Sequence, residues 1–159
     1  NRIKRSTNVV TPEQASTLIH ERFGTAETEG ESPVVVTLSP EDWFPFAKFA
    51  KDELGCRYFS FLTAVDWKDL GLEVVAKIDN VDDHLSLLVK AQLGPEVSSC
   101  PSLTPLYRGA NWMEREAHEM FGITFEGHPD LRHLLLTDDW EGHPLLKSYA
   151  VDTPYPPYR

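Results

Sequence analysis

Apolar side chains recur every three or four residues in three stretches of the chain, and this spacing is typical of amphipathic helices. The first stretch, residues 11–24, opens with Thr-Pro-Glu-Gln, a capping box with proline at the first helical position, and closes on glycine. The second, residues 39–55, opens with Ser-Pro-Glu-Asp and also closes on glycine. The third runs from Thr104-Pro105 to Gly122. We therefore expect three helices.

Short runs of β-branched and aromatic residues, bounded by polar connections, predict strands. They cover residues 34–38, 57–67, 73–79 and 85–92. The last three runs are joined by connections short enough for neighbouring strands to pair antiparallel. The polar stretch 25–32 and the stretch 94–101 are expected to be loops. This order of elements predicts an α+β fold, with an antiparallel or mixed sheet of about four strands and helices packed on one face.

Beyond the third helix the helical periodicity fades, and glycines and prolines interrupt the chain. The tetrapeptide Glu-Gly-His-Pro occurs twice there, at 126–129 and at 141–144. Between the two copies, the run Leu134-Leu135-Leu136 is compatible with a short strand or a turn. We expect one domain over residues 1–149, ending in an irregular Gly/Pro-rich segment, and an extended Pro/Tyr-rich tail over 150–159.

The third helix has an apolar and a polar face when its residues are placed about 100° apart. The apolar face is expected in the core and consists of Leu103, Leu106, Ala110, Met113, Ala117, Met120 and Phe121. On the other face Trp112 lies among charged side chains, as in interaction hot spots, although a solvated surface accounts for the same pattern. Arg115 and Glu119 are four residues apart on this face and can pair.

The net charge of −10, from 15 lysines and arginines against 25 aspartates and glutamates, disfavours binding to nucleic acid or to anionic membranes. A basic protein partner is compatible with this charge. No apolar run reaches the roughly 20 residues that a membrane helix needs. The two cysteines, Cys56 and Cys100, lie far apart and form no CxxC motif. Their number is too small for an iron–sulfur cluster or a zinc ribbon.

The histidines and glutamates of the C-terminal third raise three alternatives. A metal site would draw its ligands from His118, His128, His133, His143, Glu114, Glu126 and Glu141. However, the H-E-x-x-H spacing of a zinc helix is missing. A histidine and a glutamate could also form an acid–base pair, although nothing in the sequence selects one. The third alternative is structural, because Gly-His-Pro forms tight turns that would pin the intervening segment to the third helix. The spacing favours this structural interpretation.

Residues 111–149, NWMEREAHEMFGITFEGHPDLRHLLLTDDWEGHPLLKSY, resemble the signature of the C-subunit family of respiratory complex I, the proton-translocating NADH:quinone oxidoreductase. The family includes the mitochondrial iron–sulfur protein 3 subunit. Its pattern reads approximately E-R-E-x-x-D-x-F-G-I, then G-H-P-x-L-R-[RK], then E-G-H-P-L-R-K-D-Y. The matching positions are Glu114, Arg115, Glu116, Phe121, Gly122, Gly127, His128, Pro129, Leu131, Arg132, Glu141, Gly142, His143, Pro144, Leu145, Lys147 and Tyr149.

Four positions depart from the family pattern. Glu119 stands where an aspartate is usual and keeps the charge. His133 replaces an arginine or lysine, Leu146 an arginine and Ser148 an aspartate. These three changes remove charge around the second Gly-His-Pro turn. They put in question the salt bridges to a neighbouring subunit that the resemblance implies there.

The resemblance implies a non-catalytic structural subunit of the peripheral arm, with no cofactor of its own. FMN, the iron–sulfur clusters and quinone would be bound by partner subunits. The chain would pack against the large, hydrogenase-like D-subunit, beside the quinone-reduction site and close to the neighbouring iron–sulfur subunits of the peripheral arm. It would lie on the cytoplasmic side of a bacterial membrane or the matrix side in mitochondria. The same family supplies subunits to membrane-bound hydrogenase, the F420H2 dehydrogenase and photosynthetic complex I, so these remain alternatives. A stand-alone metal-dependent enzyme using His128 and His143 is the competing class.

The expected docking surface for the large D-subunit combines the polar face of the third helix with the two Gly-His-Pro turns. Its predicted residues are Arg108, Trp112, Glu114, Arg115, Glu116, Glu119, His128, Pro129, Asp130, Arg132, Glu141, His143, Pro144 and Lys147.

Overall fold

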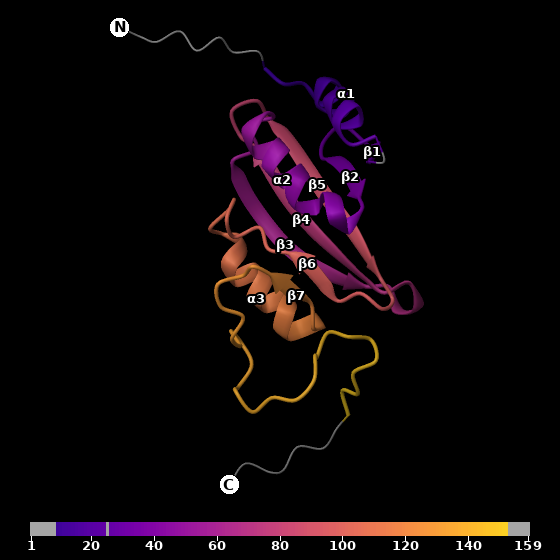
Figure 1. Cartoon of the computed structure of the whole chain (residues 1–159), viewed down its shortest axis with the longest axis vertical. Coiled ribbons are helices and arrows are strands. Elements are labelled where there is room, and N and C mark those ends of the chain that lie inside the picture. Colours follow the sequence, from indigo (N-terminus) through magenta and orange to yellow (C-terminus); the bar gives the residue numbers. More distant parts are fainter. Residues whose placement is uncertain (1–8, 25, 153–159) are drawn as a thin grey trace, which may run out of the picture.

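The computed structural model describes residues 9–24 and 26–152, which form an α+β fold (Figure 1). The helices are α1 (Pro12–Arg22), α2 (Trp43–Asp52) and α3 (Ala110–Phe121), with 3-10 turns η1 (Pro40–Asp42) and η2 (Lys68–Leu70). The strands are β1 (Glu27–Glu29), β2 (Val34–Leu38), β3 (Tyr58–Asp66), β4 (Leu72–Asn80), β5 (Leu85–Gly94), β6 (Ser99–Pro101) and β7 (Thr124–Glu126). The α+β prediction is therefore confirmed.

The main sheet has five strands in the order β1-β2-β5-β4-β3. Neighbouring strands are antiparallel except β2 and β5, which run parallel, so the sheet is mixed. It has one strand more than expected, because β1 lies in the stretch 25–32 that was predicted to be a loop. The stretch 94–101 was also predicted to be a loop, but β6 forms there and pairs parallel with β7, which follows α3. Three-residue strands of this kind depend on a distant partner and leave little pattern in the local sequence.

The capping box predicted at the start of α1 is present. The Thr11 side chain accepts the backbone N–H of Gln14, and the Gln14 side chain accepts the backbone N–H of Thr11. These two hydrogen bonds satisfy donors that the first helical turn leaves unpaired. Ala15 and Ile19 are buried, so this end of the helix is fixed to the core by its apolar side.

Helix α3 begins at Ala110, five residues later than Pro105, where the sequence predicted it. The residues before it form tight turns, in which Leu106 and Tyr107 both donate to the carbonyl of Leu103. Tertiary contacts hold this conformation. The Lys51 ammonium donates to the Leu106 carbonyl, and the Tyr107 hydroxyl donates to the carbonyl of Cys56 at 2.7 Å. These bonds to α2 and to the chain after it replace the helical bonds that local sequence alone would favour.

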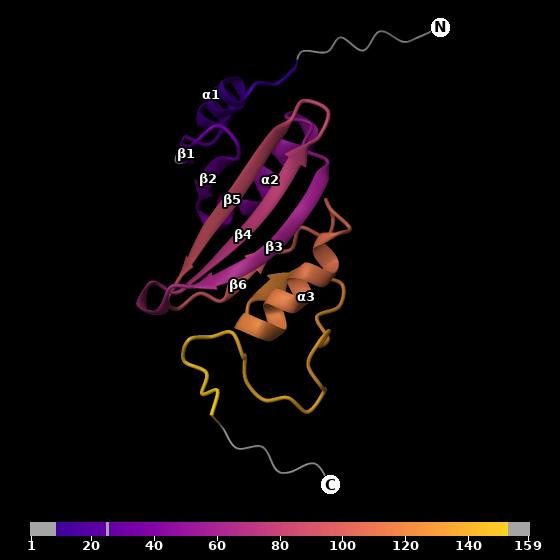
Figure 2. The ribbon, with the colours of Figure 1, turned by 180° about the vertical axis from the view of Figure 1, so that it is seen from behind.

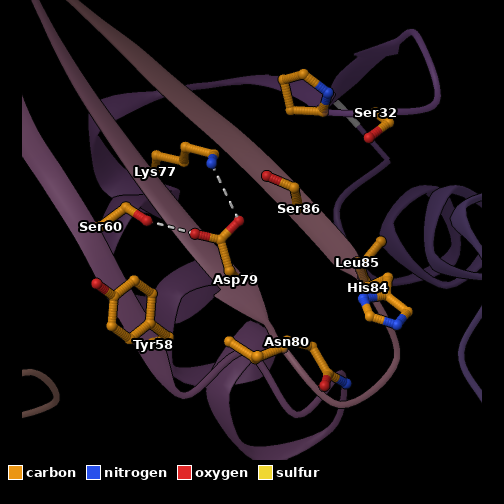
Figure 3. Close-up of a pocket in the computed structure, with 11 residues that line it drawn as sticks. Ser32, Tyr58, Ser60, Lys77, Asp79, Asn80, His84, Leu85 and Ser86 are labelled. Atoms are coloured by element: carbon orange, nitrogen blue, oxygen red, sulfur yellow. Dashed lines mark hydrogen bonds and ion pairs between the residues drawn. The ribbon is translucent and has the colours of Figure 1, made fainter.

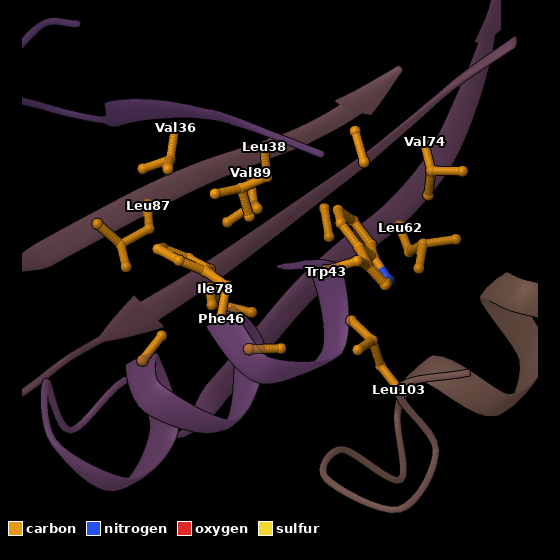
Figure 4. Close-up of a cluster of buried hydrophobic side chains, with 14 of the residues drawn as sticks. Val36, Leu38, Trp43, Phe46, Leu62, Val74, Ile78, Leu87, Val89 and Leu103 are labelled. Carbon is orange, nitrogen blue, oxygen red and sulfur yellow. The ribbon is translucent and has the colours of Figure 1, made fainter. Parts of the chain in front are cut away.

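The hydrophobic core lies between α2 and one face of the main sheet (Figure 4). Trp43 and Phe46 of α2 are buried against Ile78, Leu87 and Val89 of the central strands. Full burial of one such side chain stabilises the fold by about 2–3 kcal/mol. Helix α3 lies beside the edge strand β3, whereas no described helix crosses the opposite face of the sheet (Figure 2). The prediction that the helices pack on one face is confirmed for α2.

Residues 127–152 contain no helix or strand and follow a long path beneath α3 (Figures 1 and 2). This confirms the irregular C-terminal segment, and Leu134–Leu136 is a series of bends rather than a strand. Most of the predicted Pro/Tyr-rich tail, residues 153–159, lies outside the described residues, as do residues 1–8.

Candidate functional site

The Glu119 side chain of α3 binds three consecutive backbone amides of the C-terminal segment. Its carboxylate, 1% exposed, accepts the N–H groups of Leu134, Leu135 and Leu136 at 2.8, 2.9 and 3.3 Å. Three amide donors satisfy a buried carboxylate without a cation. Glu119 therefore fixes the backbone of this segment to the helix.

One turn earlier on α3, Arg115 binds the two preceding carbonyls of the same segment. Its guanidinium donates from Nε to the carbonyl of Arg132 at 2.9 Å and from Nη2 to that of His133 at 2.8 Å. The sequence suggested that Arg115 and Glu119 could pair with each other. Instead, Arg115 binds carbonyls and Glu119 binds N–H groups of one stretch of backbone. The bonds that attach residues 132–136 to α3 are thus made by the backbone of this stretch, and the His133 ring adds a bond from Nδ1 to the Thr137 carbonyl at 2.9 Å.

Glu114, on another side of α3, fixes the turns that precede the helix. Its fully buried carboxylate accepts the hydroxyl of Ser102 and the backbone N–H of Leu103, both at 2.6 Å. Burial raises the pKa of Glu114 to about 7, and the hydrogen bonds from Ser102 and Leu103 offset only part of that rise. This carboxyl therefore has a structural role and is an unusually weak acid for a glutamate.

The histidine of the first Gly-His-Pro turn binds the start of α3. His128 Nδ1 accepts the backbone N–H of Asp130 at 3.0 Å, so the ring proton is assigned to Nε2, which donates to the carbonyl of Asn111 at 3.0 Å. Both ring nitrogens are then satisfied in the neutral imidazole. The Glu114 carboxylate lies 4.0 Å from Nε2, and neither side chain is exposed to solvent.

The histidine of the second Gly-His-Pro turn binds the end of α3. His143 Nδ1 donates to the carbonyl of Glu119 at 2.9 Å, and the backbone N–H of Leu145 donates to the carbonyl of Met120 at 3.1 Å. A helix leaves its last carbonyls unpaired, and this turn satisfies two of them. The His143 ring lies so close to Gly122 that a Cβ there would approach it to 2.8 Å.

The two histidines do not converge on a common point. They bind carbonyls of Asn111 and Glu119, which are eight residues apart on α3 and thus roughly 12 Å apart along its axis. Within residues 9–24 and 26–152, no group of three or more His, Cys, Asp or Glu side chains is arranged to hold a metal ion. The two histidines therefore lie apart, whereas a His128/His143 metal enzyme requires both of them at one metal ion.

We call residues 127–149 the anchored segment, because α3 holds it at both ends and in the middle. Its last turn is also bound to the sheet, where the backbone N–H of Lys147 donates to the Asp66 carboxylate at 2.7 Å. That bond, with a second from the N–H of Lys68, lowers the pKa of Asp66. Leu146 packs against the core, so the residue that departs from an arginine in the family pattern makes an internal apolar contact.

The predicted docking residues fall into three groups by exposure. The exposed residues are Arg108, Trp112, Glu116, Pro129, Arg132, Glu141 and Lys147. Half-buried residues are Arg115, His128, Asp130, His143 and Pro144, although the His128 side chain itself is not exposed, and Glu114 and Glu119 are buried. The two buried carboxylates bind this chain itself, so they hold the surface in place from inside. Contact of any of these residues with the large D-subunit stays a prediction.

Two exposed leucines of the anchored segment were missed. Leu135 and Leu145 are 63% and 53% exposed, and Trp112 on α3 is 68% exposed. The backbone amides of Leu135 and Leu145 are bound to Glu119 and to the Met120 carbonyl, so both leucines are held in position with their side chains outward. In the sequence, an apolar run such as Leu134-Leu135-Leu136 resembles core residues. The outward position of Leu135 depends on the bond from its backbone N–H to Glu119, which the sequence does not show.

A surface hollow of about 560 Å³ lies elsewhere, at the end of the sheet near the β4–β5 turn (Figure 3). Its polar groups bind one another, since Ser60 donates to Asp79 and the Lys77 ammonium lies 3.4 Å from the same carboxylate. Burial raises the pKa of Asp79, but the hydrogen bonds and the Lys77 charge outweigh it and the pKa is lowered overall. His84 lies on the turn apart from this group (Figure 3). The arrangement stabilises a charged Asp79 and offers no poised acid or base.

Comparison with known proteins identifies relatives along most of the chain. Residues 36–155 match the family described as "Respiratory-chain NADH dehydrogenase, 30 Kd subunit". The NADH-quinone oxidoreductase C-subunit of Citrifermentans bemidjiense is 38% identical over 141 residues, which cover 86% of this chain and 88% of the relative. The protein of the same name from Rhodobacter capsulatus is 42% identical, over 76% of this chain and 62% of the relative. The mitochondrial 30.4 kDa subunit of Neurospora crassa NADH-ubiquinone oxidoreductase is 41% identical, over 74% and 43%.

Two solved structures share the fold. A trypsin-resistant fragment (1–134) of Nqo5 superposes with a TM-score of 0.63 at 25% identity, covering 74% of this chain and 98% of the fragment. A chain of the membrane-bound sulfane sulfur reductase, an archaeal respiratory membrane complex, gives a TM-score of 0.68 at 25% identity, covering 80% of this chain and 77% of that one. Among the described residues of the present chain, no helix is long and apolar enough to cross a membrane.

Proposed function

Because this chain belongs to the 30 kDa subunit family of respiratory-chain NADH dehydrogenase, we propose that it is a non-catalytic structural subunit of the peripheral arm of NADH:quinone oxidoreductase. The family places it in an oxidoreductase complex of several subunits. Its role is positional: it docks on the large D-subunit beside the quinone-reduction site. The contact keeps the electron-transfer groups of the neighbouring subunits in register.

The observation that carries this proposal is the way α3 uses its charged side chains. Arg115 and Glu119 bind only the backbone of the anchored segment. The exposed side chain of Leu135 is consequently held in position before any partner binds, and that of Leu145 is held through the bond from its backbone N–H to the Met120 carbonyl. Preorganisation of this kind reduces the entropy lost on association.

The proposal assigns FMN, the iron–sulfur clusters and quinone to partner subunits. Cys56 and Cys100 are both buried. Desolvation is the main cause that raises the pKa of the Cys56 thiol to about 12 and raises that of Cys100 further, which disfavours the thiolate form that binds iron. The chain then lies on the cytoplasmic side of the membrane in a bacterium, or on the matrix side in a mitochondrion.

The test replaces one exposed leucine of the docking surface by a charged residue. Leu135→Asp in the intact complex should lower incorporation of the chain by about 30-fold, because burying a hot-spot contact contributes about 2 kcal/mol or more. NADH:quinone reductase activity of the membranes should fall in parallel. Incorporation is measured by co-purification with the large D-subunit.

Leu70→Asp is the matched control, because Leu70 is 66% exposed and lies on η2, outside the anchored segment. It should leave incorporation and activity unchanged. Thermal unfolding of each isolated variant separates a docking defect from a folding defect. If a folded Leu135→Asp chain assembled normally and supported normal activity, the proposed docking role would be wrong.

A second candidate is the equivalent subunit of a related respiratory complex. The similarity to a chain of the membrane-bound sulfane sulfur reductase favours it. The chains that co-purify with this one, and the electron donor that the purified complex oxidises, distinguish the two. A stand-alone enzyme is instead indicated by stoichiometric metal and by turnover in the isolated chain.

A further inference from the structure

The buried carboxyl of Glu114 is the inner end of a short chain of hydroxyl groups. Ser102 Oγ lies 2.6 Å from Glu114 Oε2, and Thr104 Oγ1 lies 2.7 Å from Ser102 Oγ. Glu114 is fully buried and Ser102 is 3% exposed, whereas Thr104 is half-buried, so the chain of groups leads from the interior to the surface. Linked hydroxyls can pass on a proton, because each one both donates and accepts. We call these three side chains the relay.

The relay is fully hydrogen-bonded in two opposite orientations. When Glu114 is ionised, the Thr104 hydroxyl donates to Ser102 and the Ser102 hydroxyl donates to the carboxylate. When Glu114 is protonated at Oε2, its O–H donates to Ser102 Oγ and the Ser102 hydroxyl donates to Thr104. In both orientations Ser102 also accepts the backbone N–H of Thr104, and Glu114 Oε1 accepts that of Leu103. The buried groups therefore lose no hydrogen bond when a proton binds or leaves.

A proton crosses the relay by a shift of three O–H bonds. The carboxylic proton of Glu114 moves to Ser102 Oγ, the former Ser102 proton moves to Thr104 Oγ1, and the former Thr104 proton passes to water. One proton leaves the carboxyl and one reaches the solvent, and both hydroxyls are neutral before and after. Burial raises the pKa of Glu114 to about 7, against the hydrogen bonds from Ser102 and Leu103, so both forms are populated near neutral pH.

His128 is the neighbour that responds to the charge of this carboxyl. Its Nε2 lies 4.0 Å from Glu114 Oε2 and donates to the carbonyl of Asn111 at 3.0 Å. Its Nδ1 accepts the backbone N–H of Asp130, so neither ring nitrogen has a free lone pair for the carboxylic proton. An ionised carboxylate at this distance in the protein interior attracts the N–H that binds Asn111. A protonated carboxyl carries no charge and does not attract it in this way.

The other charged or titratable side chains around Glu114 do not pair with it. They are Arg115, Glu116, His118 and Glu119 on α3, Arg108 before it, Cys100 on β6, Glu126 on β7, Tyr58 and Asp66 on β3, Lys51 on α2, and Asp130 and Arg132 after the first Gly-His-Pro turn. Bound to backbone groups elsewhere are Arg115, His118, Glu119, Asp66 and Lys51, and Asp130 pairs with Arg132. Exposed to solvent are Arg108, Glu116, Glu126 and Tyr58. Burial, followed by the charges of Glu114 and Glu126, raises the pKa of the Cys100 thiol, which stays protonated.

We propose that the relay is a proton-binding site, which exchanges its proton with solvent through its two hydroxyls, and that His128 transmits its protonation state to the first Gly-His-Pro turn. With the carboxyl protonated, the Nε2–H of His128 stays on the Asn111 carbonyl and holds the turn at the start of α3. With the carboxyl ionised, the same N–H turns towards Glu114 and the bond to Asn111 lengthens. This inference concerns the interior of the chain and does not depend on the proposed function.

The first experiment follows the side-chain carboxyl of Glu114 by 13C NMR of the full chain between about pH 5 and pH 9, with Glu114→Gln to assign the signal. We expect a titration with a midpoint near 7. Thr104→Val keeps the shape of the side chain and removes its hydroxyl. A protonated Glu114 then leaves the Ser102 O–H without an acceptor, whereas an ionised Glu114 still accepts it. The midpoint should therefore fall by about one pH unit.

Thr104→Ser is the matched control, because serine keeps the hydroxyl, and its midpoint should stay that of the wild type. If Thr104 served only to cover the carboxyl, Thr104→Val would leave the midpoint unchanged or raise it, and that result overturns the relay. A Glu114 carboxyl that stays in one form over this pH range in the wild type overturns it without any variant.

The second experiment records the Nε2–H of His128 by 15N–1H NMR in the same samples. Its chemical shift should titrate with the midpoint of Glu114 and move to the lower midpoint in Thr104→Val, whereas Glu114→Gln should abolish this titration. The ring of His143, which binds the Glu119 carbonyl at the other end of α3, is the internal control and should not follow Glu114. If the Nε2–H of His128 stays constant while Glu114 titrates, the transmission to the turn is overturned.

Discussion

Two buried glutamates on α3 show how differently the same residue type is used within one helix. Glu119 accepts three backbone N–H groups, whereas Glu114 accepts one backbone N–H and one hydroxyl. Both were predicted as partner-interface residues because their sequence positions match a charged motif. Their burial could not be read from that motif, since their partners are backbone groups many residues away. Sequence reasoning found the residues and missed the groups that they bind.

Replacement of Glu119 by glutamine should loosen the anchored segment. A glutamine has one acceptor oxygen, and its NH2 group cannot accept the remaining N–H groups of Leu134, Leu135 and Leu136. Leaving a buried amide unsatisfied costs about 1–3 kcal/mol. Hydrogen exchange of these three amides should therefore become roughly 5- to 150-fold faster, as measured by NMR or mass spectrometry.

The control is Glu116→Gln, an exposed glutamate on the same helix. It should leave the exchange of these amides unchanged. Equal exchange rates in the wild type and in Glu119→Gln would show that the carboxylate does not hold the segment.

Glu114 should make stability depend on pH in the opposite direction from an ordinary ion-paired carboxylate. Its pKa is about 7 in the folded chain against an ordinary value of 4.5, so the folded state holds the proton more tightly than the unfolded state. The stability that this group contributes is present below about pH 4.5 and is lost as the pH rises towards 7. The loss is on the order of 1–3 kcal/mol.

Glu114→Gln removes this titration and retains partners for Ser102 and Leu103, because the amide offers one acceptor and one donor. The difference in unfolding free energy between variant and wild type, from urea unfolding, should shift in favour of the variant between pH 5 and pH 8. Titrations common to both proteins cancel in this difference. A difference independent of pH would contradict the assignment.

At the scale of elements, α3 is the element to which most other C-terminal features are attached. Its Glu114 side chain binds the turns that precede the helix, and its Arg115 and Glu119 side chains bind residues 132–136. Its C-terminal carbonyls accept hydrogen bonds from the second Gly-His-Pro turn. The sequence predicted the helix, its glycine stop and both turns. It misplaced the first turn of the helix, because Lys51 and the Cys56 carbonyl hold residues 106–107 in another conformation. Boundaries set by tertiary bonds of this kind leave no local signal.

Gly122, which ends α3, is an element boundary that is sensitive to substitution. It adopts φ +77°, and an added Cβ would meet the His143 ring at 2.8 Å. Gly122→Ala should destabilise the chain by about 2–3 kcal/mol, from the left-handed conformation together with displacement of the ring. The unfolding temperature should fall by about 4–12 °C, measured by calorimetry.

Gly109→Ala is the matched control at the other end of α3. An alanine there would lie 3.8 Å from the Phe59 ring, an ordinary contact, and the backbone is already helical. It should change the unfolding temperature little. If Gly122→Ala were equally mild, the second Gly-His-Pro turn would not be packed against the helix end.

For the whole molecule, the sequence predicted the class of fold and the order of its larger elements. The α2 helix and strands β2 to β5 follow from hydrophobic patterns that each segment carries alone. Strands β1, β6 and β7 could not be predicted, because each forms through pairing with a segment that its own residues do not specify. In the same way, only the strand register shows that Val35, Leu88 and Phe61, taken from three separate runs, share one face of the sheet.

The backbone contacts made by Arg115 and Glu119 have a consequence for how such a subunit can change over time. Any residue except proline supplies the amides and carbonyls that these two side chains bind. The bonds to Arg115 and Glu119 therefore do not depend on which side chains stand at positions 132–136, and the exposed position of Leu135 can accept a new side chain without losing them. A point substitution at an exposed position of this stretch can thus match a changed partner surface while the fold of the chain stays the same.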